Sequence, residues 1–222
     1  MTQPEIEIRG AWRQIVGNHF DRHIDSLLGR YAEPHRHYHT VTHIMFVLRD
    51  LHDASRAAAA QPSAEVLAAA LYHDAIYDPR ANDNEVRSAD LAATHLSDIG
   101  WSYARCRSVA ALILATAGHL VQRDPADGND SIDAADAVDT ALLLDADLAI
   151  LGADPGGYQA YVNGVRAEYS HIDDNQWRAG RTAVLQRFLD RPRLFITNYM
   201  YSSYEHRARA NIEAEVAALR AE

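Results

Sequence analysis

Hydrophobic residues recur at helical spacing along most of this chain, and clusters that alternate with a period of two are hard to find. The first pattern predicts an amphipathic helix over about residues 9–29. Thr40 can cap a second helix that runs through Leu51, and Pro62-Ser63 open a third that stops near Asp78-Pro79. Further helices are predicted over residues 84–98, 102–117, 135–151, 156–170, 174–190 and 203–220.

These patterns predict an all-α protein. The stretch Asp124 to Asp133 is rich in Asp, Gly, Pro and Asn and is the one clear break in the helical pattern. We find no internal repeat and no low-complexity tract. We therefore interpret residues 1–222 as a single helical-bundle domain, with the helices of 156–220 packed on the preceding part.

Composition narrows the classes of partner. The formal net charge is −10, which disfavours a nucleic acid polymer or an anionic membrane as a partner. A phosphate substrate would have to meet locally positive charge. All 21 basic residues are arginines, so Schiff-base chemistry and a phosphate-loop lysine are excluded.

The single cysteine and the lack of long apolar runs indicate in which cellular compartment the protein lies. Cys106 is the only cysteine, so no internal disulfide can form. Met1–Gly10 contains no apolar signal segment, and no run approaches 18 apolar residues. We expect a cytoplasmic protein. The last predicted helix, with Ile212 and Val216, can pack on its own bundle or on a second subunit, so a homodimer stays open.

Several histidines and aspartates are candidates for metal ligands. Four histidines lie within nine residues, from His35 to His43, and a His73-Asp74 doublet follows an apolar run. Asp145 and Asp147 come later in another predicted helix. Imidazole nitrogens and carboxylate oxygens together suit a divalent first-row metal, and a helical bundle can direct such ligands inward from separate helices. The sequence therefore predicts a metal site.

The order of these residues resembles the HD superfamily, and more narrowly the bacterial group described as predicted metal-dependent HD phosphohydrolases. Three motifs carry the resemblance, and weaker ones extend it over roughly residues 12–200. The three are Tyr38-His39-Thr40-x-x-His43-Ile44, Tyr72-His73-Asp74-Ala75-Ile76-Tyr77-Asp78 and Leu144-Asp145-Ala146-Asp147-Leu148-Ala149-Ile150-Leu151-Gly152. The weaker ones include Asn84-Glu85, Ser88-Ala89, Val165-Arg166-x-Glu168-Tyr169 and Gly180-Arg181.

The resemblance implies an HD-type fold and a set of metal ligands. The family's first histidine matches His43, and its doublet matches His73-Asp74. Its last aspartate matches Asp145 or Asp147, which lie roughly 200° apart on a helix and cannot both reach one ion from the same face. The Ala-Asp-x-Leu pattern of the wider superfamily favours Asp147, with Asp145 as a partner that orients a ligand histidine.

Five further residues are candidates for the reaction itself. His39 is a candidate proton donor or phosphate contact, or else a capping histidine. Arg36 is a candidate phosphate clamp or a surface arginine. His119 is a candidate cavity residue or a core histidine. Asp78 and Glu85 can hold a water or act as general base, although plain roles in a turn and at a helix N-terminus are slightly favoured for them.

The function that the resemblance implies is hydrolysis of a small phosphate ester, a nucleotide among the options, by metal-activated water. Mn, Mg, Co, Ni, Fe and Zn are not distinguished, nor is one ion from two. An HD-type di-iron oxygenase is one alternative, for which His95 and His119 would supply extra ligands. A non-catalytic, ligand-binding HD module is the other.

Overall fold

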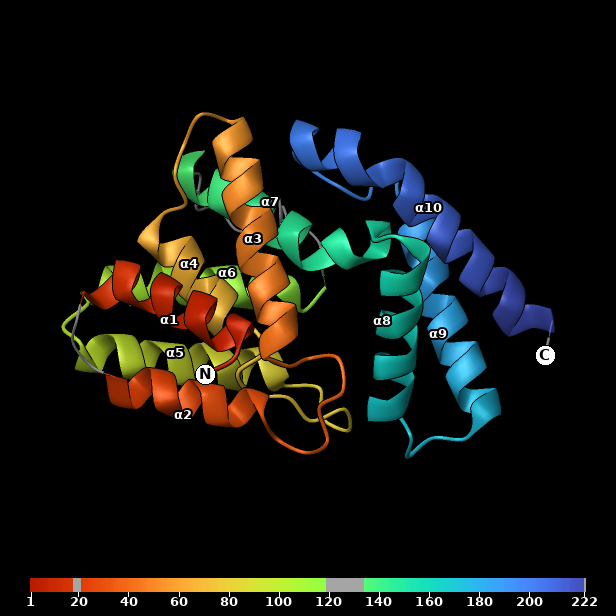
Figure 1. The fold of residues 1–222 in the computed structure, drawn as a ribbon, viewed down its shortest axis with the longest axis horizontal. Helices are drawn as coiled ribbons and strands as arrows, with labels where there is room; N and C mark the ends of the chain where they lie inside the picture. The colour runs from red at the N-terminus through yellow and green to blue at the C-terminus, as the bar shows by residue number, and fades with distance from the viewer. Residues whose placement is uncertain (18–20, 119–133, 222) are drawn as a thin grey trace, which may run out of the picture.

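The computed structural model describes residues 1–17, 21–118 and 134–221, and all the regular structure in these ranges is helical (Figure 1). The predicted all-α class is confirmed. The helices are α1 (Gln3–Val16), α2 (Asp21–Tyr31), α3 (Val41–Ala57), α4 (Ala64–Tyr72), α5 (Asn84–Asp98), α6 (Tyr103–Thr116), α7 (Ala134–Leu148), the 3-10 helix η1 (Ala149–Gly152), α8 (Pro155–Glu168), α9 (Asp174–Leu189) and α10 (Asn198–Ala221).

Two predicted helices differ from the structure. The single helix expected over 9–29 is wrong, because α1 ends at Val16 and its C-cap Gly17 has a φ of 70°, a positive value that glycine adopts without strain. The helix expected to run to Asp78-Pro79 ends at Tyr72, so the His73-Asp74 doublet lies just past the end of α4. The predicted Asp124–Asp133 break falls outside the described residues.

Side-chain caps determine where several helices begin. The Thr40 hydroxyl accepts a hydrogen bond from the Thr42 amide at 3.3 Å, and the Ser63 hydroxyl accepts one from the Val66 amide at 3.0 Å. Such caps satisfy amides that the first helical turn leaves without partners. The Thr40 cap starts α3 at Val41, and this start places His43 in its first turn.

The buried apolar side chains form two clusters. The first joins α1 to α6 with part of α7, and the second joins α8, α9 and α10 with other residues of α7 and with Ala54 of α3. Figure 1 shows α8, α9 and α10 together on one side and α1, α2 and α4–α6 on the other, with α3 and α7 between them. Both α3 and α7 therefore contribute to both clusters, which places their side chains where the two halves meet.

Helix α4 is the centre of the first cluster. Every residue from Val66 to Tyr72 is buried, as expected for a helix that is apolar on all sides. The helix delivers His73 into the interior at its C-terminal end, where the helix dipole favours a cation. None of the described helices has the length and the apolar character that crossing a membrane would require.

Candidate metal centre

Three separated segments bring two imidazoles and an aspartate together in the interior. His43 comes from the first turn of α3, His73 from the end of α4, and Asp147 from the last turn of α7. The two Nε2 atoms lie 3.2 Å apart, and Asp147 Oδ1 lies 3.2 Å from His43 Nε2 and 3.5 Å from His73 Nε2. These three side chains form a group that could hold a metal ion.

Asp74 lies beside both imidazoles but is not part of the group whose donor atoms all lie close to one another. Its Oδ2 lies 3.4 Å from His43 Nε2 and 3.2 Å from His73 Nε2. Two ligand atoms that each lie about 2.1 Å from one ion are about 3.0 Å apart at 90° and about 3.4 Å apart at the tetrahedral angle. The separations among His43, His73 and Asp147, which are 3.2–3.5 Å, therefore match donor atoms arranged around a single ion.

A hydrogen bond on the far side of His73 prepares its ring for a cation. His73 Nδ1 lies 3.0 Å from the Ala70 carbonyl, which can only accept, so Nδ1 carries the proton. In the neutral ring the lone pair of Nε2 then faces a second imidazole nitrogen and two carboxylate oxygens. Acceptors that face acceptors are stable only with a proton or a cation among them. The donor set thus fits a divalent metal.

The close approach of these charged groups shifts their pKa values. Burial alone would lower the pKa of His73, but the carboxylates of Asp74 and Asp147 raise it well above its ordinary value. Burial would raise the pKa of Asp74, but His73, His39 and His43 together hold it well below its ordinary value. The site is strongly negative around two buried nitrogens, which is the potential that attracts a cation.

The structure separates the two aspartates of α7. Both oxygens of Asp145 accept backbone hydrogen bonds at 2.7 Å, from Ile196 and from Thr197. Asp145 therefore holds the segment that leads into α10, and its predicted roles as alternative ligand and as partner of a ligand histidine are wrong. The Ala70 carbonyl, a backbone group that side-chain motifs do not reveal, orients His73 instead.

Arg36 is neither a phosphate clamp nor a surface residue. Its side chain is completely buried, and its guanidinium donates to the carbonyls of His39, Asp74 and Ala75 and to the Glu33 carboxylate. These donors are committed to protein acceptors and hold the histidine-rich loop against the doublet. The predicted phosphate contact is wrong because the guanidinium is buried and its donors are taken by the carbonyls of Asp74 and Ala75, just past the end of α4, and of His39.

His39 is held beside the centre by Glu168, the last residue of α8. His39 Nδ1 lies 2.7 Å from Glu168 Oε2, its Nε2 lies 4.0 Å from Asp74 Oδ2, and its ring stacks on Tyr77 at 4.2 Å. Glu168 Oε1 also accepts the backbone amides of His37, Tyr38 and His39 at 2.8, 2.8 and 3.0 Å. Glu168 thus fixes both the loop and the imidazole.

Glu168 stands in one of the weaker motifs of the resemblance without a predicted role, although its position in the helix is a signal. A carboxylate at a helix C-terminus opposes the helix dipole, so such a position requires a tertiary reason. Gly164 explains how α8 comes so close, because a Cβ there would lie 3.1 Å from the Tyr38 Cβ and 3.2 Å from the His37 carbonyl oxygen.

The other residues predicted for the site do not lie together. Glu85, in the first turn of α5, lines a cavity together with His39 and Asp74. Asp78 is exposed, and its Oδ1 accepts the Arg80 amide, so it has the turn role rather than a place in that cavity. His119 lies outside the described residues. His95 packs against His23, with ring centroids 4.3 Å apart.

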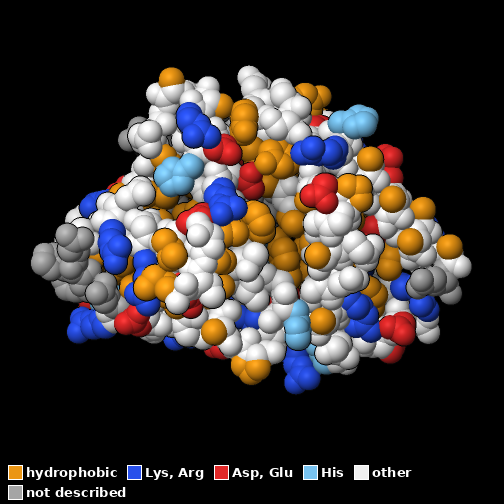
Figure 2. Space-filling view, in the orientation of Figure 1, with side chains coloured by type: hydrophobic (Ala, Val, Ile, Leu, Met, Phe, Trp, Pro, Cys, Tyr) orange, Lys and Arg blue, Asp and Glu red, His pale blue; other side chains and the backbone are white. Residues whose placement is uncertain are grey.

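Two cavities meet at the centre. One, of about 490 Å³, contains His39, His73, Asp74 and Glu85 in its lining, and the other, of about 580 Å³, contains His43. Asp147 lines both. Figure 2 shows hydrophobic side chains gathered in a hollow at the middle of the molecule, where the two halves meet, with charged side chains near its edge. A metal held here would be reachable from two sides.

The fold and the donor set define a helical protein with a candidate metal centre of His43, His73 and Asp147, next to Asp74. Comparison of the chain with known proteins finds no matching family model, no similar curated protein and no similar solved structure.

Proposed function

We propose that this protein is a metal-dependent phosphohydrolase of the HD type that acts on a small phosphate ester. The observation that carries the proposal is the convergence of His43, His73 and Asp147 at separations suited to one divalent ion, with Asp74 beside both imidazoles. These residues would hold the ion, and the two cavities that meet there would give water and a phosphate ester access to it.

A divalent ion bound there supplies an acidified water near neutral pH and offsets the negative charge that develops on the phosphoryl oxygens. The protein's own groups do the rest. Glu168 accepts from His39 Nδ1 and so directs His39 Nε2 toward the Asp74 side of the centre, where it can give a proton to the leaving oxygen. Glu85, on the wall of the same cavity, can hold a water by accepting its hydrogen bond.

Phosphate binding does not fall to a free arginine in this cavity. Arg181, which lines it, is buried and donates to both oxygens of Glu215 and to the Tyr161 hydroxyl. On this side of the centre, the positive charge that a phosphate ester requires would therefore come from the ion, with His39 as a hydrogen-bond donor. This dependence makes metal removal a direct test of the proposal.

The test is phosphate release from a panel of phosphate esters, nucleotides included, by protein stripped of metal and reloaded with Mn, Co, Ni or Mg. We expect turnover only in reloaded protein, and His73→Gln to lower both metal affinity and turnover at least about 100-fold. His206→Gln, at an exposed histidine of α10, is the matched control and should change neither. Folded, metal-loaded protein that releases phosphate from no ester would overturn the proposal.

A further inference from the structure

The larger of the two cavities has the composition of a pocket for an organic group. Its walls are Phe46, Val47, Ala146, Ala149 and Ile150, with the rings of Tyr38 and Tyr161. Its volume of about 580 Å³ is within the roughly 300–1,000 Å³ usual for small-molecule sites. Its apolar walls contrast with the charged groups around the other cavity.

This cavity follows one face of α3. His43 and Asp50 both line it, and residues seven apart on a helix return to nearly the same face about 10 Å farther along the axis. His43 belongs to the metal centre, so the cavity runs from the centre to a carboxylate. A ligand that spans it has one end at the metal and the other at Asp50.

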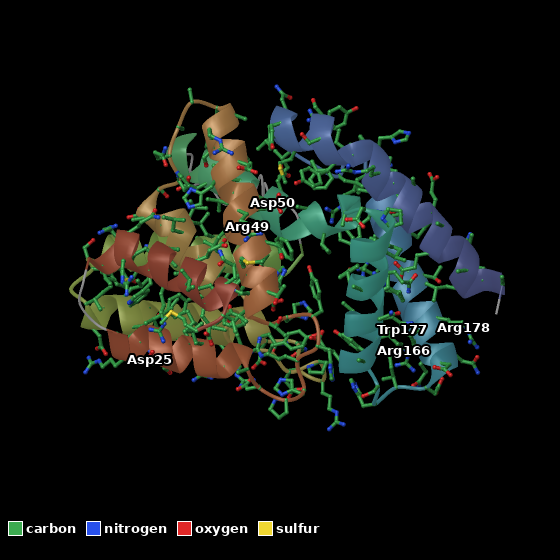
Figure 3. All side chains as sticks on the ribbon, viewed as in Figure 1. Asp25, Arg49, Asp50, Arg166, Trp177 and Arg178 are labelled. Atoms are coloured by element: carbon green, nitrogen blue, oxygen red, sulfur yellow. The ribbon has the colours of Figure 1, made fainter. Side chains whose placement is uncertain are left out.

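At the end of the cavity away from the metal, the Asp50 carboxylate is a hydrogen-bond acceptor that is already oriented. It lies between α3 and α10 (Figure 3), and its Oδ1 accepts the Tyr204 hydroxyl at 2.6 Å. Oδ2 receives no hydrogen bond within the described part of the chain. Burial raises the pKa of Asp50 to about 6. A half-buried carboxylate with an open oxygen in an apolar wall is stabilised by a ligand that donates to it.

The position of Tyr204 is fixed by backbone packing. A Cβ at Gly152 would lie 2.8 Å from the Tyr204 Cβ and 2.9 Å from the Tyr204 carbonyl oxygen, so α10 rests directly on η1. This close contact holds the hydroxyl of Tyr204 against Asp50 and leaves the second oxygen of Asp50 to the cavity. The acceptor is therefore oriented before any ligand arrives.

We propose that this cavity binds the organic part of the substrate, and that Asp50, held by Tyr204, selects phosphate esters whose apolar or planar group ends in an N–H or O–H donor. The substrate class is then a phosphate ester with an amine, amide or hydroxyl opposite its phosphate, a description that includes nucleotides. This inference rests on the proposed phosphohydrolase function for the placement of the phosphate at the metal.

The experiment measures binding rather than turnover, by calorimetry on the metal-loaded full chain with three non-hydrolysable probes. The probes are benzylphosphonate, 4-(hydroxymethyl)benzylphosphonate and 4-(aminomethyl)benzylphosphonate. We expect the two donor-bearing probes to bind about tenfold more tightly than benzylphosphonate, the gain of a hydrogen bond to a charged acceptor. Asp50→Leu should abolish this preference and leave the affinity for benzylphosphonate within about twofold.

Two further variants test whether the preference for donor-bearing probes depends on Asp50 in particular. Asp53→Leu removes a carboxylate from the same helix but outside the cavity lining, and it should keep the tenfold preference. Glu85→Leu removes the acceptor of the other cavity and should also keep it. Loss of the preference in Glu85→Leu instead of Asp50→Leu would overturn the inference, because the organic group would then occupy the other cavity.

The two proposals fail in distinguishable ways. If no ester is hydrolysed but Asp50→Leu abolishes the probe preference, the hydrolase function fails and the pocket stands. If esters are hydrolysed but wild type and Asp50→Leu bind the three probes alike, the pocket assignment is overturned and the hydrolase function stands. Absence of binding by all three probes to metal-loaded protein also overturns the pocket assignment.

Discussion

Replacing Glu168 by glutamine tests how the histidine-rich loop is held against the metal centre. Its carboxylate accepts three backbone amides, the Tyr77 hydroxyl and His39 Nδ1, and its side chain is fully buried. Glutamine is nearly the same size but neutral, and its NH2 group must face either the three backbone amides or the Tyr77 and His39 donors, all of which need an acceptor. We therefore expect loss of stability without loss of packing volume.

The magnitude follows from the ionisation of Glu168. Burial would raise its pKa, but the hydrogen bonds and charge of His39 and the backbone amides lower it from 4.5 to about 2. Each tenfold change in an acidity constant is worth about 1.4 kcal/mol, so the ionised carboxylate contributes about 3 kcal/mol to folding at neutral pH. Because the folded-state pKa is lowered, this contribution is complete above about pH 4.5 and is lost as pH falls toward 2.

The assay is urea unfolding of wild type and Glu168→Gln at a series of pH values from 7 to 3. We expect the variant to be less stable by about 3 kcal/mol at pH 7, and the difference to shrink by about 2 kcal/mol at pH 3. Glu213→Gln, at an exposed carboxylate of α10, should change stability by less than about 0.5 kcal/mol. A difference between wild type and Glu168→Gln that is absent, or that does not vary with pH, would refute the reasoning.

Three further predictions address the centre, the cavity and the helix contact. Asp147→Asn should weaken metal binding by at least about 100-fold in calorimetry. Asp145→Asn should still bind the metal but lose about 2–4 kcal/mol of stability in urea unfolding. Equal loss of metal in both variants would contradict the different roles of Asp145 and Asp147. Burial raises the pKa of Asp50 to about 6, so its ionisation costs stability as pH rises from about 4 to 7, and Asp50→Asn should gain on wild type over that window in thermal unfolding. Gly152→Ala places a methyl group 2.8 Å from a tyrosine Cβ and should cost about 2–4 kcal/mol, whereas Gly180→Ala, with nothing within 4 Å, should be neutral or stabilising.

Local chemistry in the sequence was sufficient to predict most helices. The caps Thr40 and Ser63, and the uninterrupted apolar run of α4, act through contacts within one or two turns, so they can be recognised without the tertiary structure. The sequence also predicted a metal site containing His43 and His73, because the residue types and their place beside apolar runs suggest buried ligands. The predicted helix over 9–29 was wrong because a single glycine, Gly17, adopts a conformation that the hydrophobic period does not reveal.

Only the tertiary structure decided which partners the buried polar groups find. Helical period shows that Asp145 and Asp147 face different ways, but it does not show that the segment before α10 lies behind Asp145. In the same way, Arg36 is committed to carbonyls just past the end of α4, and Glu168 reaches His39 from 129 residues away. A buried charge must be paired by whatever the fold brings to it, and residues so distant along the chain leave no local pattern that identifies the pair.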